Sequence, residues 1–223
     1  MNISTIDYVV FENILKRGTA EVLEDKENAL FIYDTLSEGY FLACEDFDLG
    51  MSILDKYIDD IHLLMVTNTK IGDEAYKKYG FDGKSDCYQF AYYEKDIDEG
   101  DLISFREASK ADIPVLLDNY DKISAEEMEK EVSLGNISLG YDGKNLVGFM
   151  GEHLEGSMGL LYVFPEFRRR GYASAFEKHF IKSTIEKGFI PYGHVIKDNE
   201  ASIKLQKSLG LEQSENLISW MWR

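Results

Sequence analysis

Three consecutive arginines, Arg168 to Arg170, stand directly before Gly171 in the stretch FPEFRRRGYASAF. The strand-like segment GLLYVF precedes them, and the residues after Gly171 have the apolar spacing of a helix. The first N–H groups of a helix lack partners within it, and with the helix dipole they bind phosphate. The arginines would add charge-assisted hydrogen bonds. The stretch therefore predicts a phosphate-binding loop, although alone it is also compatible with a solvated basic loop.

Turn and capping signals place the elements around this loop. Ser109 and Ser124 each precede an acidic residue by three positions, as in a capping box, and Gly135 follows as a stop for the second of these helices. Strand-like segments flank Asp142-Gly143, the strongest hairpin signal in the chain. Downstream we expect a helix over 173–187, a strand over 191–196, a helix over 199–208 and a final strand over 216–222.

The chain contains an internal repeat with a constant offset of 130 residues. Residues 67–93 align with 197–223, so that Gly80 falls on Gly210 and Phe90 on Trp220. Each copy is expected to be a short helix, a glycine stop and an aromatic-rich strand. The alternative to duplication is a chance similarity between two such units. The first copy has no arginine–glycine run upstream, so only the second half carries the predicted phosphate loop.

A second motif lies after the predicted phosphate loop. Asparagine, two residues, serine, two residues and leucine precede a Leu-Gly-Leu step, and the chain supplies them as Asn199, Ser202, Leu205, Leu209, Gly210 and Leu211. Together with Arg168, Gly171 and Ala173, these residues resemble the GNAT superfamily of CoA-dependent N-acyltransferases over residues 102–223. Within it, the segments PEFRRRGY and GFIPYGHV look closest to the glycine N-acyltransferase-like branch.

The resemblance implies an α/β fold of the mixed-sheet (α+β) kind, built from two GNAT-like halves with helices on both sides of each sheet. Residues 1–101 would be a degenerate N-terminal domain and residues 102–223 the catalytic domain. The cosubstrate would be acetyl-CoA, without a metal. It would contact Leu161, Val163, Arg168, Arg169, Arg170, Gly171, Tyr172, Ala173, Ser174, Asn199 and Ser202, and the Val163 N–H would polarise the thioester carbonyl. For Asn199 the simpler alternative is a helix N-cap.

The family reaction is direct attack of a neutral amine on the thioester in a ternary complex. The chain departs from the common pattern at two positions. Gln206 stands where many members have a tyrosine that acts as the general acid, and the strand segment GSMGLLYV lacks the glutamate that commonly acts as the base. Glu152 and His194 are our candidate catalytic residues, and for each a structural role is the alternative. The leading hypothesis is an acetyltransferase acting on an amine-bearing small molecule or peptide. The second is an acyl-CoA-binding sensor or scaffold without activity.

Composition narrows the possible partners and compartment. The net charge is −17, and residues 1–103 alone carry 23 acidic and 9 basic side chains, which disfavours nucleic acid or an anionic membrane as a partner. Cys44 and Cys87 lack metal-ligand spacing, so we expect free buried thiols rather than a disulfide. The first 18 residues carry acids within their apolar run, unlike a secretory signal, and we expect a cytoplasmic protein.

Overall fold

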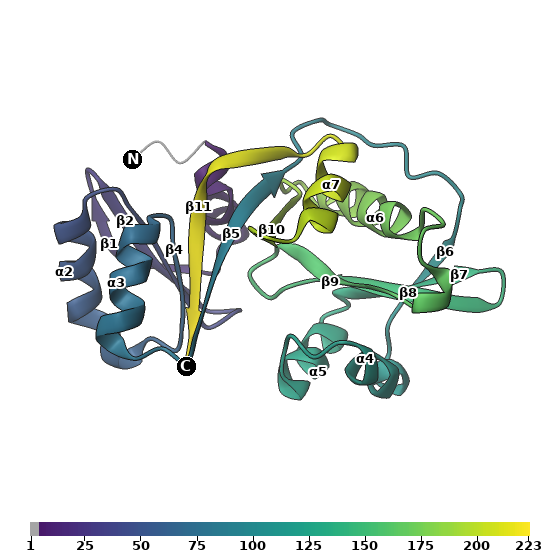
Figure 1. Ribbon diagram of the computed structural model, residues 1–223, viewed down its shortest axis with the longest axis horizontal. Coiled ribbons are helices and arrows are strands. Elements are labelled where there is room, and N and C mark those ends of the chain that lie inside the picture. Colours follow the sequence, from purple (N-terminus) through teal and green to yellow (C-terminus); the bar gives the residue numbers. More distant parts are fainter. Residues whose placement is uncertain (1–4) are drawn as a thin grey trace. The chain divides into compact units, whose positions relative to one another are not determined.

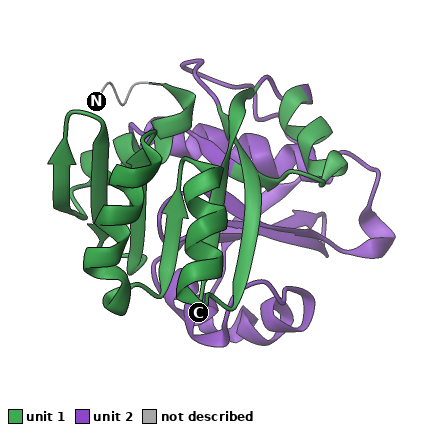
Figure 2. Ribbon diagram, turned by 60° about the vertical axis from the view of Figure 1, so that its left-hand side comes forward, with its two compact units in different colours: residues 1–91, 194–207, 211–223 green, residues 92–193, 208–210 purple. Residues whose placement is uncertain are grey.

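The computed structural model describes residues 5–223, so the first four residues of the N-terminal segment lie outside the described residues. The chain forms two compact units, which Figure 2 shows in different colours. Unit 1 comprises the described residues up to Ala91 together with residues 194–207 and 211–223. Unit 2 comprises residues 92–193 and 208–210. The chain therefore enters unit 1, passes through unit 2 and returns to unit 1.

Unit 1 contains strands, α-helices and two short 3-10 helices. In chain order its elements are η1 (Ile6–Tyr8), α1 (Val9–Arg17), β1 (Ala20–Lys26), β2 (Ala29–Asp34), β3 (Gly39–Cys44), α2 (Phe47–Tyr57), η2 (Ile58–Asp60), β4 (Leu63–Val66), α3 (Thr69–Tyr79), β5 (Gly83–Ala91), β10 (Tyr192–Ile196, whose last three residues belong to this unit), α7 (Glu200–Ser208) and β11 (Glu212–Trp222).

These strands form a seven-stranded mixed sheet in the order β1-β2-β3-β4-β11-β5-β10. β3 and β4 are parallel, whereas β11 runs antiparallel to both β4 and β5. The last strand of the described chain thus lies inside the sheet, between two strands that precede unit 2 in the sequence (Figure 1). Its backbone hydrogen bonds hold β4 and β5 in one sheet.

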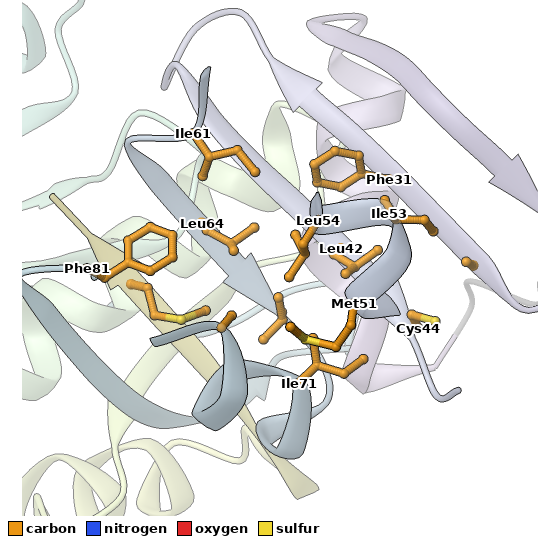
Figure 3. Packing of buried hydrophobic residues seen from close by; sticks show 14 residues of the cluster. Phe31, Leu42, Cys44, Met51, Ile53, Leu54, Ile61, Leu64, Ile71 and Phe81 are labelled. Carbon is orange, nitrogen blue, oxygen red and sulfur yellow. The ribbon is translucent and has the colours of Figure 1, made fainter. Parts of the chain in front are cut away.

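Apolar side chains hold α2 and α3 against one face of this sheet. Figure 3 shows the packed cluster, in which Met51 and Leu54 of α2 and Ile71 of α3 meet Leu42 and Leu64 of the strands. All five are buried, so water is excluded from this layer. This is the burial that stabilises an amphipathic helix on a sheet.

The opposite face of the sheet is closed by aromatic packing. Phe11 of α1 meets Phe41 of β3 edge-on, with ring centroids 6.3 Å apart, and Phe41 meets Trp220 of β11 at 5.6 Å. Phe11 and Phe41 are fully buried. The aromatic character of the last strand, visible in the sequence as LISWMW, therefore serves the core of unit 1.

Unit 2 is a four-stranded antiparallel sheet with helices on both faces (Figure 1). α6 covers one face, and α4 and α5 cover the other, where Leu116, Met128 and Val132 pack on Leu139 and Phe149. Its elements are β6 (Ser104–Glu107), η3 (Lys110–Asp112), α4 (Ile113–Asn119), α5 (Ala125–Ser133), β7 (Ile137–Asp142), β8 (Asn145–Glu152), β9 (Met158–Val163), η4 (Pro165–Phe167) and α6 (Tyr172–Glu186).

The local signals read from the sequence are confirmed here. Ser109 and Asp112 form the capping box, and the Ser124 hydroxyl accepts a hydrogen bond from the Glu127 amide at 3.0 Å. The hairpin also forms, but Asp142 pairs with Asn145, so the two turn residues are Gly143 and Lys144. The turn is shifted by one position because Gly143 takes the left-handed conformation, with φ +61°, at the first turn position.

Both copies of the sequence repeat have the expected helix–glycine–strand structure. Gly80 ends α3 with φ +69° and Gly210 follows α7 with φ +86°, and each glycine leads into a strand. The strands of the two copies, β5 and β11, pair with each other. The division into GNAT-like domains at residues 101 and 102 stays a prediction. The compact units are divided differently, because β11 completes the sheet of unit 1.

Both cysteines are buried and free, as expected. Burial raises the pKa of the Cys44 thiol and raises that of Cys87 to about 11. Neither thiol is therefore suited to act as a nucleophile at neutral pH. Across residues 5–223, no helix combines the length and the apolar character needed to cross a membrane.

The insertion of β11 generates a prediction at Gly72 of α3. A Cβ atom at this position would lie 2.6 Å from the Ser219 Cβ of β11. Gly→Ala normally stabilises a helix by about 1 kcal/mol, but this contact should reverse the sign and cost about 1–3 kcal/mol. Urea unfolding of Gly72→Ala measures the change.

A double-mutant cycle with Ser219→Gly supplies the control. Removing the Ser219 side chain should relieve the collision, so the two changes should be less destabilising together than their sum. Strict additivity would contradict the contact between α3 and β11.

Candidate functional site

The edge strand β9 leads into the loop that contains the three arginines. It contains a β-bulge at Leu160, whose φ is +53°. Phe149 pairs with Tyr162 and Gly151 with Gly159, so two residues of β9 face the single residue Met150 of β8. Such a bulge bends an edge strand and redirects its backbone groups.

After the bulge, the backbone of β9 faces alternately toward and away from β8. The Phe164 amide donates to the Val147 carbonyl at 3.0 Å, so the backbone groups of Val163 face away from β8. Leu161 is part of the bulge, opposite Met150. The resemblance to GNAT proteins predicted that Leu161 and Val163 contact acetyl-CoA, and this stays a prediction.

The loop between β9 and α6 presents a run of backbone N–H groups. Arg169 takes the left-handed conformation with φ +62°, and Gly171 follows with φ +86° as the N-cap of α6. Gly171 makes no side-chain cap, and the amides from Arg169 to Ser174 have no backbone partner among residues 5–223. This arrangement of unsatisfied donors at the start of a 15-residue helix suits an anion.

Two of the three arginines stabilise the loop itself. The Arg168 Nε donates to the Val163 carbonyl at 2.9 Å, and its guanidinium lies 5.6 Å from the Tyr162 ring centroid. The Arg170 guanidinium donates to the Glu166 carbonyl at 3.0 Å and lies over Phe167. All three arginines are exposed. In this structure, Arg168 and Arg170 therefore hold the loop in its conformation. This role is additional to the positive charge for anion binding that the sequence analysis assigned to the arginines.

A hydrogen bond to the end of β7 also fixes the start of α6. The Tyr172 hydroxyl donates to Asp142 Oδ2 at 2.6 Å, at the end of β7. This hydrogen bond, more than burial, raises the pKa of Tyr172. Ala173 and Ser174 follow with small side chains, which leave their amides accessible from the loop side.

The corresponding strand-to-helix connection of the first half differs in charge. α2 follows β3 directly, and the Asp46 side chain accepts a hydrogen bond from the Leu49 amide at 2.9 Å. A carboxylate therefore occupies the helix start that is open in α6. This cap would repel an anion, in agreement with the missing arginine–glycine run.

Glu152, a predicted catalytic residue, contacts α6. Its Oε1 accepts a hydrogen bond from the Thr184 hydroxyl at 3.0 Å, and its Oε2 lies 3.4 Å from Lys187 Nζ. Thr184 is buried. These contacts tie β8 to the C-terminal part of α6, and a catalytic role for Glu152 stays a prediction.

His194, Asn199 and Ser202 belong to unit 1. Both ring nitrogens of His194 are engaged, Nδ1 by the Trp220 indole and Nε2 by Gln89, each at 3.3 Å. The Asn199 Oδ1 accepts from the Ser202 amide at 3.2 Å, so Asn199 caps α7. A base function of His194 would require one of its hydrogen bonds to break. The CoA contacts expected for Asn199 and Ser202 stay predictions.

A group of titratable side chains in unit 2 went unrecognised in the sequence. Glu127 and Glu131 of α5, with His153 and Glu155 of the turn after β8, form what we call the acid–histidine cluster. Glu131 shares the buried face of α5 with Met128 and Val132. Glu131 follows Met128 by three positions and directly precedes Val132. This position on the apolar face of a helix is the signal that could have identified it. Among residues 5–223, no group of three or more His, Cys, Asp or Glu side chains is arranged to hold a metal ion.

Comparison with known proteins connects this geometry to a family. The FR47-like protein family matches residues 134–220. A solved Drosophila protein matches all of this chain and 91% of its own, with a TM-score of 0.69 and 14% identity. No curated protein sequence matches significantly.

Two further solved structures carry a family name. A GCN5-related N-acetyltransferase-like protein from Streptococcus suis has a TM-score of 0.55 and 16% identity over 95% of this chain and 93% of its own. A GCN5-related N-acetyltransferase from Kribbella flavida has a TM-score of 0.59 and 10% identity over 99% and 95%. These likenesses show the fold, which this chain shares with solved proteins named as GCN5-related N-acetyltransferases.

The open helix start predicts the effect of Gly171→Glu. The new carboxylate would lie among the unsatisfied amides and repel an anionic ligand. Acetyl-CoA affinity, measured calorimetrically, should fall about 100-fold or more, which corresponds to about 3 kcal/mol. Gly188→Glu is the matched control, because Gly188 has nearly the same φ, +84°, with open space around it. Equal affinities for the two variants would contradict the site.

The buried Glu131 predicts an unusual pH dependence of stability. Burial raises its pKa from the model-peptide value of 4.5 to about 7. The folded state therefore binds the proton more tightly, so this contribution is present at low pH and is lost as pH rises from about 4.5 through about 7. The loss is at most about 3 kcal/mol.

Glu131→Gln tests this dependence. The free energy of unfolding of the wild type relative to this variant should fall between pH 5 and pH 8, as measured by urea unfolding at each pH. Glu129→Gln, an exposed change on the same helix, is the control. A difference between wild type and Glu131→Gln that does not change with pH would contradict the burial of a charge.

Proposed function

We propose that the protein transfers the acetyl group of acetyl-CoA to an amine, with both substrates bound together. The observation that carries this proposal is the continuous arrangement of β9, the loop and α6. It offers the outward-facing N–H of Val163 on the edge strand, followed by unsatisfied amides from Arg169 to Ser174. One end suits an extended amide-containing arm and the other a diphosphate.

Acetyl-CoA fits this arrangement by chemistry. The amides around Gly171 would hold the diphosphate, and a Cβ at Gly171 would meet only Leu102, so the approach to its backbone is open. The pantetheine arm would pair with Leu161 and Val163. An N–H of this strand would then polarise the thioester carbonyl, a contribution worth about 3 kcal/mol for one donor.

Direct attack by the amine is favoured over a covalent enzyme intermediate. The thiols of Cys44 and Cys87 are buried, and burial raises the pKa of each, so neither supplies a thiolate. Holding the amine and the thioester together supplies much of the rate acceleration without a nucleophilic side chain. The structural neighbours that carry the name N-acetyltransferase support the choice of an acyl-CoA reaction.

The expected activity is tested by release of free CoA thiol. Acetyl-CoA and a panel of primary amines are mixed with the full chain, and thiol appearance and acetylated product are followed together. Amine-dependent release that is lost in Gly171→Glu and kept in Gly188→Glu supports the transferase. Acetyl-CoA binding without release for any amine would instead support the sensor or scaffold.

A further inference from the structure

The acid–histidine cluster lies between α5 and the start of β9. The Glu127 Oε1 is 3.9 Å from His153 Nδ1, an ion-pair distance. Glu155 is buried, with its Oε1 accepting from the Ser157 hydroxyl, and its carbonyl accepts from Tyr192 at 2.8 Å. The imidazole is thus the one basic group among three carboxyl groups.

Glu131 is fully buried in this cluster and only half satisfied. Its Oε2 accepts a hydrogen bond from the Asn136 side chain at 2.6 Å. Its Oε1 has no hydrogen-bond partner among residues 5–223. A buried carboxylate oxygen without a partner destabilises the fold, so its presence calls for a chemical reason. Above about pH 7, the raised pKa of Glu131, it offers negative charge beside an imidazole that can gain a proton.

His153 is in turn seated directly on β9. A Cβ atom at Gly159 would lie 2.5 Å from His153 Nε2, so only the missing side chain at Gly159 lets the ring rest there. The side chain of His153 is 27% exposed, its Nε2 lies against Gly159, and no hydrogen bond to Nε2 is formed within residues 5–223. The ring is therefore partly open to solvent, whereas Glu131 is fully buried.

The position along β9 also matters. If the diphosphate occupies the loop after Val163, the pantetheine arm runs back along the strand toward its beginning. Gly159 precedes Leu161 by two residues, about 7 Å along a strand. His153 therefore lies at the beginning of β9, on the sheet face that α5 covers. The acyl group reaches it if the pantetheine arm pairs with Val163 and the polarising N–H belongs to the start of this strand, in place of the Val163 N–H that the resemblance implied.

We propose that His153 accepts the proton of the acceptor ammonium group, with Glu127, Glu131 and Glu155 holding the imidazole and its positive charge. This inference rests on the proposed function. The ammonium nitrogen gives one proton to Nε2, and its freed lone pair forms the C–N bond to the acyl carbon as the C–S bond breaks. The CoA thiolate leaves with the sulfur electrons, and the second proton lost by the nitrogen neutralises it.

The electrostatics agree with this role. Burial opposes protonation of His153, but its interaction with Glu127 and the charges of Glu155 and Glu131 outweigh burial and raise its pKa above 6.5. The acting base is the neutral ring, so kcat/KM should rise with pH through this raised pKa. Two tyrosines also lie at the cluster. Burial raises the pKa of Tyr120 to about 12, so it stays neutral, and the Tyr192 hydroxyl donates to the Glu155 carbonyl.

The test compares pH–rate profiles of the full chain and three variants. His153→Ala should lower kcat/KM about 100-fold or more and remove the rise with pH. Added imidazole should restore part of its activity, which a purely structural role would not allow. Glu127→Gln should shift the rise to lower pH, because the pKa of His153 falls. Glu129→Gln is the matched control and should keep the wild-type profile.

Gly159→Ala keeps the proposal testable if His153→Ala fails to fold. The new methyl group displaces the ring without removing it, so kcat should fall by a larger factor than acetyl-CoA affinity does. Activity of His153→Ala or Gly159→Ala within about threefold of wild type, with the same pH rise, would overturn the role of His153 alone. Wild-type protein without amine-dependent thiol release would overturn the proposed function, and this inference with it.

Discussion

The pairing of β11 with β4 and β5 is the interaction on which the architecture of unit 1 depends. Without it, β4 and β5 would have no common neighbour, and the sheet would divide into β1–β4 and β5–β10. The same strand places Ser219 under α3 and Trp220 against Phe41, so both faces of the sheet are packed on it. A segment distant in sequence therefore completes the core of the first half of the chain.

Local signals in the sequence predicted most elements, because each depends on neighbouring residues. Ser124 caps α5 and Gly188 follows α6 in the left-handed conformation, and both are recognisable from residue type alone. The partner of the final strand could not be predicted in this way. β5 and β11 have similar patterns, and nothing in an alternating apolar strand specifies which of two sheets will receive it.

The candidate site shows the same division. The glycine, the small residues after it and the preceding strand led to the strand–loop–helix arrangement that the structure has, and anion binding by the loop stays a prediction. The contact of Arg168 with the Val163 carbonyl was not predictable, because it depends on how the loop folds back on its own strand. The acid–histidine cluster was missed for a related reason. Glu131 and His153 are distant in sequence. Only the packing of α5 on the sheet buries the Glu131 carboxylate beside the His153 ring.

The path of the chain has a consequence for biosynthesis. A ribosome makes β1 to β5 first, yet the strand that fills the gap between β4 and β5 emerges only after the whole of unit 2 has been translated. Until then the nascent sheet exposes two unpaired edges and an open apolar face. Exposed strand edges can pair with other chains. The segment from β1 to β5 is therefore the part of the nascent chain that a holding chaperone would most need to protect.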